Sequence, residues 1–299
     1  MDIHTDTFGG EYPFKPNYVK IDGYRQHYID AAPLNKPGAE PIVLLHGNPT
    51  WSFLYRKFVP PLVEAGYRAI APDYIGWGRS DKPADFSFYR LENRIKYFTK
   101  FMDLLNLKDI TLVMQDWGGP IGLGYAVEHP ELIKRLIIMS TWAFEWPEKV
   151  VLPSFFRVCT EPYLGEALLM GYNLFIEGFF FTEIKRKERL TPEVMRGFRA
   201  PFPDFLSRTA TRVIQDVPFY KEHPSFGTMK RIEGQLNKLK VPTLLVWGED
   251  DILLPVYDIW QKIYPHSELH MVPRAGHFIQ EDAPEEVVAI IKGFLARNR

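Results

Sequence analysis

Short runs of apolar residues recur along the chain and are separated by longer segments with helical spacing. Each run is four to six residues long, apolar or β-branched, and bounded by Gly, Pro or Asp. Continuous rather than alternating apolarity is typical of strands buried on both faces of a parallel sheet. Six such strands are predicted, at residues 42–45, 68–71, 110–114, 136–139, 243–247 and 268–272.

The segments between these runs predict helices. In the last of them the apolar residues recur at the spacing of one helix face. The predicted helices are residues 52–64, 91–105, 119–128 and 284–297. Residues 18–29 alternate between polar and apolar and predict antiparallel strands. Strands that alternate with helices indicate an α/β fold, with a mostly parallel central sheet flanked by helices.

Residues 147–227 interrupt this alternation. They contain no buried-strand pattern and are rich in Phe, Arg and Pro, which favours a helical insertion. We therefore expect a core domain of residues 1–146 and 228–299 and a helical cap of residues 147–227. Most of the large apolar side chains of the cap are expected to pack against the core, and a minority to line an apolar pocket. Trp142 and Trp146, just before the cap, fit a pocket wall and ordinary packing equally well.

Composition narrows the function classes. The 299 residues include 46% hydrophobic ones, which argues against disorder, and a net charge of −1 gives no basic excess for nucleic acid. The single cysteine, Cys159, forms no internal disulfide and no cysteine zinc site. The sequence shows no secretory signal and no apolar run long enough to span a membrane, so we expect a cytoplasmic protein. No metal or cofactor is predicted, and the oligomeric state is left open.

A nucleophile elbow is predicted at residues 112–119. A buried strand runs into Asp116, and Trp117 and two glycines lead into a helix, which is the strand–turn–helix context of that motif. A carboxylate is already ionised at neutral pH, so Asp116 needs no base to attack an sp³ carbon. A helix N-cap is the ordinary alternative for an Asp at this place.

Three further loops follow strands, and two of them come after Asp116 in the order expected of an acid and a base. The loop of His46, Gly47 and Asn48 can direct a backbone N–H at the nucleophile, although an ordinary Asn-Pro turn is the alternative. His277 lies on a Gly-containing loop after the last strand and suits a general base. Between Asp116 and His277, residues 249–251 are three consecutive acids, any one of which can orient His277.

Together these motifs resemble the α/β-hydrolase superfamily, and residues 46–52 and 115–119 resemble haloalkane dehalogenases. The resemblance implies that Asp116 is the nucleophile, that His277 is the base and that Asp251, the fourth residue of Gly-x-x-Asp, is the acid. It also implies that Trp117 and Asn48 bind the halide through their side chains, and that the backbone N–H groups of the same two residues form the oxyanion hole. The predicted reaction converts a haloalkane and water to an alcohol and halide.

One dehalogenase subfamily has its acid, a Glu, after the strand that ends near Met139. Ser140 and Thr141 stand there in this chain, so Glu145 is only an outside candidate for that role. Epoxide hydrolases resemble the chain at the elbow but differ at the positions of Gln115 and Asn48. They also need two cap tyrosines as acids, for which the candidates are Tyr163, Tyr172 and Tyr220.

Residues 212–218 and 223–226 resemble the dehalogenase subfamily that also contains β-lactone decarboxylases. Those enzymes share the Asp, His and Asn-Trp positions but release carbon dioxide and an alkene from a hydrophobic lactone. The expected partner is thus a small hydrophobic substrate, a haloalkane or a β-lactone, with water. A non-catalytic binding protein of the same fold is the remaining alternative, and it would require a damaged triad.

Overall fold

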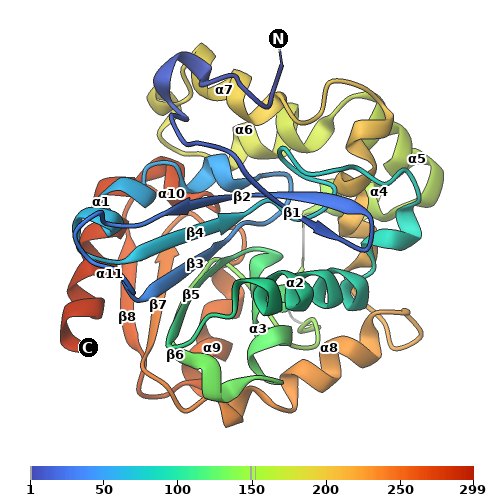
Figure 1. The fold of residues 1–299 in the computed structure, drawn as a ribbon. Coiled ribbons are helices and arrows are strands. Elements are labelled where there is room, and N and C mark those ends of the chain that lie inside the picture. The colour runs from blue at the N-terminus through green and yellow to red at the C-terminus, as the bar shows by residue number, and fades with distance from the viewer. Residues whose placement is uncertain (1, 149, 152) are drawn as a thin grey trace.

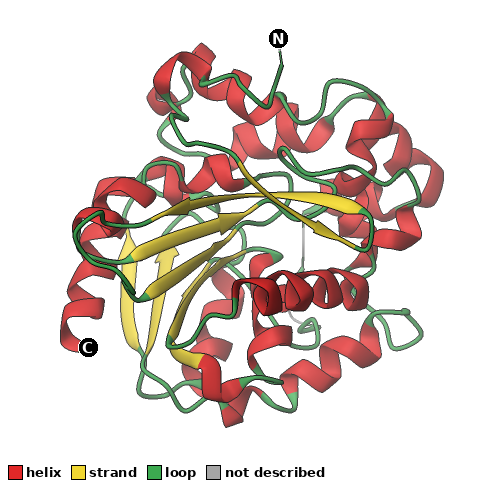
Figure 2. Ribbon diagram, viewed as in Figure 1, coloured by secondary structure: helices red, strands yellow, loops and turns green. Residues whose placement is uncertain are grey.

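The computed structural model describes residues 2–148, 150–151 and 153–299. In this part of the chain eight strands form one sheet in the order β1-β2-β4-β3-β5-β6-β7-β8 (Figures 1 and 2). The strands are β1 (Asn17–Ile21), β2 (Tyr24–Ala31), β3 (Pro41–Leu45), β4 (Arg68–Pro72), β5 (Ile110–Gln115), β6 (Ile133–Met139), β7 (Thr243–Gly248) and β8 (Glu268–Val272).

The sheet is mostly parallel. β1 pairs with β2 and β2 with β4 in antiparallel fashion, and every pairing from β4 to β8 is parallel. All six strands predicted from apolar runs are present, and the predicted antiparallel N-terminal segment is the β1–β2 pair. The chain therefore has the predicted α/β-hydrolase architecture.

Helices cover both faces of the sheet. Figure 1 shows α1 and α11 together on one face and α2, α3 and α8 together on the other. The α-helices are α1 (Val59–Glu64), α2 (Leu91–Leu105), α3 (Gly118–Ala126), α4 (Ser154–Thr160), α5 (Pro162–Glu166), α6 (Phe181–Glu183), α7 (Pro192–Arg199), α8 (Phe226–Glu233), α9 (Tyr257–Ile263), α10 (Ile279–Asp282) and α11 (Pro284–Arg297).

Two elements differ from their predictions. Residues 52–64 form a 3₁₀ turn, Ser52–Tyr55, followed by α1 rather than one helix. Two prolines lie in the first turn of α1, where their missing N–H groups cost no hydrogen bond, so the helix begins there. Strand β8 is not buried on both faces, because it lies at the edge of the sheet and alternates between exposed and partly buried residues.

The described residues of the segment 147–227 form helices and no strand. Helices α4–α7 lie together above the sheet in Figure 1, with the 3₁₀ segment Leu206–Asp216 beside α4 and α5. No single helix among the described residues is long and apolar enough to cross a membrane. One pair, Pro162–Gly171 and Phe175–Glu183, passes that test of length and composition only when taken together, and it is bent by 67°.

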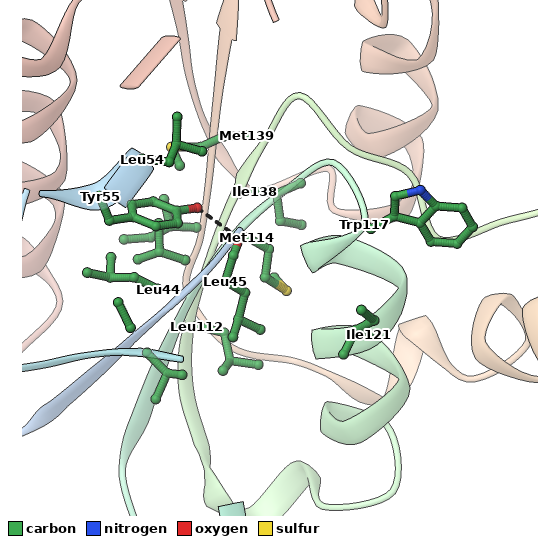
Figure 3. Close-up of a cluster of buried hydrophobic side chains, with 14 of the residues drawn as sticks. Leu44, Leu45, Leu54, Tyr55, Leu112, Met114, Trp117, Ile121, Ile138 and Met139 are labelled. Atoms are coloured by element: carbon green, nitrogen blue, oxygen red, sulfur yellow. Dashed lines mark hydrogen bonds between the residues drawn. The ribbon is translucent and has the colours of Figure 1, made fainter. Parts of the chain in front are cut away.

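The central strands are anchored by a buried apolar cluster (Figure 3). Side chains of β3, β5 and β6 pack between Tyr55 on one side and Ile121 of α3 on the other. The Tyr55 hydroxyl donates a hydrogen bond of 2.9 Å to the carbonyl oxygen of Leu45, the last residue of β3. This packing fixes the carboxyl end of β3 against its neighbours.

The register of the strands brings three loops to one edge. Leu45 at the end of β3 pairs with Met114 of β5, and Gln115 at the end of β5 pairs with Met139 at the end of β6. The residues that follow each strand therefore meet at the carboxyl edge of the sheet. Ligands of open α/β sheets bind at this edge.

Candidate active site

Asp116 lies in a strained turn between β5 and α3. Its φ of +51° is in the left-handed region, which side-chain-bearing residues rarely adopt and which is characteristic of functional turns. Asp116 N donates to the carbonyl of Ser140 at 2.9 Å, and the hydroxyl of Thr141 donates to the carbonyl of Asp116. A Cβ on Gly118 would lie 2.4 Å from the Leu45 carbonyl oxygen, so only glycine allows α3 to start this close to β3.

The loop after β3 contacts the carboxylate of Asp116 directly. The backbone N–H of Asn48 donates to Asp116 Oδ1 at 2.7 Å. A Cβ on Gly47 would lie 2.2 Å from the same oxygen, which explains the glycine at this position. Among the described residues the backbone N–H of Trp117, the other predicted oxyanion donor, makes no hydrogen bond to this carboxylate.

His277 lies between two carboxylates. Its Nε2 is 3.5 Å from Asp116 Oδ2, and its Nδ1 is 3.3 Å from Asp251 Oδ1. The side chains of His277 and Asp251 are buried, and that of Asp116 is 13% exposed. The structure thus brings the three predicted catalytic residues together in the order carboxylate, imidazole, carboxylate.

The other acids considered for this position lie elsewhere. Glu249 and Asp250 are exposed, whereas Asp251 turns inward and accepts the backbone N–H of Leu253 at 2.8 Å. Glu145 forms an ion pair with Lys230 at the surface.

Two contacts of His277 were not predicted from the sequence. The hydroxyl of Ser140 lies 2.5 Å from His277 Nδ1, closer than Asp251 does. The amide nitrogen of Gln115 lies 3.0 Å from His277 Nε2 and donates to the backbone carbonyl of His277 at 3.2 Å. Each residue directly follows a predicted strand, 110–114 or 136–139, and the two strands pair beside the nucleophile. This position is the signal that could have identified them.

The surroundings of His277 act on its pKa in opposite directions. Burial lowers the pKa of His277, but the hydrogen bonds and charges of Asp116 and Asp251 outweigh it and raise the pKa to about 10. The Gln115 amide donates to Nε2 only when that nitrogen carries no proton, so it favours the neutral ring. The negative charge of Asp116, by contrast, is one of the causes that keep the imidazole protonated.

The side chain of Asn48 is held on both sides. Its Oδ1 accepts the indole N–H of Trp77 at 3.2 Å, and its Nδ2 donates to the carbonyl of Thr211 at 3.1 Å. One of the two N–H bonds of the amide is thus used by the segment 147–227, and the other is left for a ligand. Sequence reasoning missed both Trp77 and Thr211.

Trp117 presents its indole to a cavity. Among the described residues its Nε1 makes no hydrogen bond, and the ring packs edge-on against Trp142 at 5.0 Å between centroids. The cavity also contacts Asp116, His277 and Asn48 and is otherwise apolar. Its remaining walls are Trp142, Trp146, Phe156, Phe175, Phe179, Ile214, Val217, Phe219, Ile252 and Leu253.

The cavity beside Asp116 is small and adjoins a larger one. The inner cavity has a volume of about 40 Å³ and the outer one about 330 Å³, and they share Trp146, Phe156 and Phe219 as walls. The tyrosines considered as acids for an epoxide are turned outward: Tyr163 is 91% exposed, Tyr172 75% and Tyr220 57%. None of these three residues lines either cavity.

The loop that carries His277 is tied to the segment 147–227 by Asp282. One carboxylate oxygen of Asp282 accepts the backbone N–H groups of Lys185 and Arg186, and the other accepts that of Gly276. Nearby, Glu183 has a side chain only 13% exposed. Burial raises the pKa of Glu183, and the positive charges of Lys185 and His277 partly offset this.

Comparison with known proteins agrees with this fold. A family model described as the alpha/beta hydrolase fold matches residues 40–284. The chain is 39% identical to a cis-3-alkyl-4-alkyloxetan-2-one decarboxylase of Shewanella oneidensis, over 96% of this chain and 90% of that protein. It is 32% identical to a haloalkane dehalogenase of Mycolicibacterium paratuberculosis, over 93% and 91%. The crystal structure of haloalkane dehalogenase DbeA from Bradyrhizobium elkani superimposes with a TM-score of 0.86 at 28% identity, over 95% and 98%.

Proposed function

Because the chain belongs to the α/β-hydrolase family, in the group that contains haloalkane dehalogenases and β-lactone decarboxylases, we propose that it displaces a leaving group from an sp³ carbon through an ester on Asp116. The observation that carries this proposal is the position of one carboxylate. Asp116 faces an apolar cavity, accepts the N–H of Asn48 at 2.7 Å and lies 3.5 Å from His277. The first candidate reaction is hydrolytic dehalogenation of a haloalkane.

In the first step, Asp116 attacks the carbon that bears the halogen. Oδ1 stays on the Asn48 N–H and becomes the carbonyl oxygen of the ester, and Oδ2 forms the new C–O bond. The C–X bond breaks with its electron pair on the halide. The indole N–H of Trp117 and the remaining amide N–H of Asn48 then stabilise that halide in a cavity with few other polar groups.

In the second step, water hydrolyses the ester. Esterification removes the negative charge of Asp116, which is one of the causes of the raised His277 pKa. The imidazole then loses its proton more readily, and neutral Nε2 takes a proton from the attacking water while Asp251 stabilises the imidazolium. The ester bond breaks as the imidazolium returns this proton to the departing oxygen, and the alcohol leaves. Asp116 then gives the remaining proton of the water to His277 and is regenerated as a carboxylate, so that the net proton released is the one that the imidazole lost to solvent after esterification.

The second candidate reaction is decarboxylation of a β-lactone to an alkene. The specific observation in its favour is the 39% identity to the Shewanella decarboxylase over 96% of this chain. In this reaction Asp116 attacks the sp³ ring carbon that bears the ring oxygen, and the bond between that carbon and the oxygen breaks, which opens the lactone to a carboxylate. Loss of carbon dioxide then sends an electron pair into a C=C bond, and the Asp116 carboxylate leaves. No water is consumed.

The cavities favour a hydrophobic substrate with an extended chain. The inner cavity of about 40 Å³ is far smaller than a usual ligand pocket, whereas the adjoining outer cavity adds about 330 Å³. A reacting carbon beside Asp116 with an alkyl chain between Trp146 and Phe219 would occupy both. The exposed tyrosines give no support for epoxide opening.

The same proposal divides the chain into a core of residues 1–146 and 228–299 and a cap of residues 147–227. The absence of strands from the described part of the cap segment, and its contribution of Phe156, Phe175 and Phe179 to the cavity wall, support this division. The proposed boundary at residue 227 falls inside α8.

The test is a side-by-side assay of the purified protein. Halide release from 1-bromobutane and 1,2-dibromoethane is measured beside alkene release from a synthetic cis-3,4-dialkyl β-lactone. Either product, lost in Asp116→Ala, supports the displacement mechanism and identifies which reaction is catalysed. Turnover that persists in Asp116→Ala would exclude the mechanism, as would a folded wild type that releases neither product.

A further inference from the structure

A buried arginine stacks on the tryptophan that the proposed function assigns to the leaving group. Arg94 lies on α2, and its guanidinium carbon is 3.8 Å from the centroid of the Trp117 ring. The Arg94 side chain is 2% exposed. A cation this close to the face of an indole interacts strongly with the ring, and burial strengthens the interaction because water does not screen it.

Asp216 holds the guanidinium in this position. Its Oδ2 accepts Arg94 Nη2 at 2.9 Å, and its Oδ1 accepts Arg90 Nη1 at 3.0 Å. The Asp216 carboxylate also accepts the backbone N–H of Leu91 and the hydroxyl of Ser225. Two arginines thus share one carboxylate, which leaves one positive charge uncompensated in this cluster.

Arg94 is the cation of this cluster that lies beside the candidate site, over the Trp117 ring. Arg94 Nε and Nη1 are buried, and no described residue accepts a hydrogen bond from them. Burial lowers the pKa of Arg94, and the carboxylates of Asp216 and Asp116 partly offset that effect. The charge of Arg94 therefore acts on Asp116 as well as on its direct partner. Arg90, by contrast, is 35% exposed and lies over Phe86.

We propose that Arg94 is a positioning residue that raises the affinity of the Trp117 site for the anion formed in the reaction. The guanidinium fixes the plane of the indole, polarises its N–H and adds a positive potential behind it. An anion at Trp117 Nε1 and the negative charge that develops there in the transition state are both stabilised. This inference rests on the proposed function, because it assumes that Trp117 receives the leaving group.

Bromide binding measures this effect separately from turnover. Saturable quenching of tryptophan fluorescence by bromide, at constant ionic strength, gives a dissociation constant, and Trp117→Phe identifies the part that comes from this site. In Arg94→Met the dissociation constant is expected to rise about tenfold, consistent with loss of a buried cation–π contact. The inhibition constant of bromide as a product inhibitor is expected to rise to a similar extent.

Arg90→Gln is the matched control. It removes the other cation of Asp216 without touching Trp117, so bromide affinity is expected to stay within twofold of the wild type. Arg94→Lys, which keeps the charge but not the planar stack, is expected to fall between the wild type and Arg94→Met, and it replaces Arg94→Met if that variant does not fold.

Three results would overturn the inference. Unchanged bromide affinity in a folded Arg94→Met variant would reject the proposed role of Arg94 and leave the proposed function intact. Equal weakening in Arg94→Met and Arg90→Gln would assign the effect to the Asp216 cluster rather than to the stacked cation. Absence of saturable quenching in the wild type would reject the halide role of Trp117, and the inference with it.

Discussion

The hydroxyl of Ser140 lies 2.5 Å from Nδ1 of His277, whereas the nearest oxygen of Asp251 is 3.3 Å from the same nitrogen. The imidazole therefore has two oxygen partners on one side, one neutral and one charged. Ser140 has a φ of +43° at the end of β6, so the backbone itself is turned to present this hydroxyl. Ser140 helps to hold the ring, and Asp251 supplies the charge that stabilises its protonated form.

This division of roles predicts unequal effects of two substitutions. Asp251→Asn is expected to slow ester hydrolysis by about 10²–10⁴-fold, because the imidazolium loses its countercharge. Ser140→Ala removes only a neutral hydrogen bond, worth about 1 kcal/mol, and is expected to slow the same step by about tenfold or less. Single-turnover measurements of the hydrolysis step compare them. If Ser140→Ala is the slower variant, Ser140 and not Asp251 is the main partner of His277.

A second prediction concerns the covalent intermediate. In His277→Gln the base is lost but Asp116 is not, so a reactive alkyl bromide is expected to leave a stable ester on Asp116. Intact-protein mass spectrometry detects the added alkyl group, and peptide mapping locates it. Asp116→Ala is the control and should carry no adduct; an adduct on any other residue would contradict the assignment of the nucleophile.

The two candidate reactions respond differently to this change. Dehalogenation needs His277 for the second step, whereas the β-lactone route regenerates Asp116 without water. His277→Gln is therefore expected to stop halide turnover after one equivalent while it allows repeated alkene release. Repeated halide turnover in this variant would rule out His277 as the base.

A third prediction follows from the pKa of His277. The pKa is about 10 in the folded protein, against 6.5 for an unperturbed histidine, so the native state holds this proton more tightly than the unfolded chain does. The resulting stability is fully present below pH 6.5 and is lost as the pH rises through 10. Urea unfolding between pH 6 and 10 should show a steeper loss of stability for the wild type than for His277→Gln. Parallel profiles would contradict this coupling.

The fourth prediction tests the close approach of Gly47 to the nucleophile. An added methyl group at residue 47 would lie 2.2 Å from Asp116 Oδ1, so Gly47→Ala must displace either the carboxylate or the loop of Asn48. We expect more than about a hundredfold loss of turnover, because small displacements of reacting groups are costly. Initial-rate kinetics on the folded variant provide the measurement.

Gly227→Ala is the matched control for this substitution. No atom lies within 4 Å of the position that its Cβ would occupy, and the residue is in α8. The change is expected to leave turnover unaltered and to raise the free energy of unfolding by up to about 1 kcal/mol. Equal loss of activity in both variants would show that the effect at residue 47 is not local.

The sequence predicted the strands well because burial on both faces leaves few polar residues in them. Strand β5 and the elbow at Asp116 were predicted from the five apolar or β-branched residues 110–114 and the two glycines that follow Trp117. The edge strand was predicted less well: residues 268–272 were grouped with the buried runs, although Glu268 and His270 alternate there with apolar residues. This alternation matches the position of β8, which has a neighbouring strand on one side only.

The sequence predicted where the candidate site lies, at the carboxyl edge of the sheet, but it predicted few of the polar contacts within and around that site. Glu183 stands close in the sequence to the charged residues 185–188, which is typical of an exposed segment, yet packing beside the His277 loop buries most of its side chain. Arg94 stands among ordinary helix-forming residues of α2, and its burial depends on Asp216, which is 122 residues further along the chain. Such pairs carry no local signal, because either residue alone resembles a surface charge.

The carboxylate of Asp282 also couples two parts of the chain that lie far apart in the sequence. Moving residues 185 and 186 outward would break two hydrogen bonds to this carboxylate or pull Gly276 and the neighbouring base with them. Residues 185–186 and the loop of His277 are therefore expected to move together or not at all. On the proposed function, the length of a substrate chain is then limited at Trp146, Phe156 and Phe219, the walls that the two cavities share, and not at the reacting carboxylate.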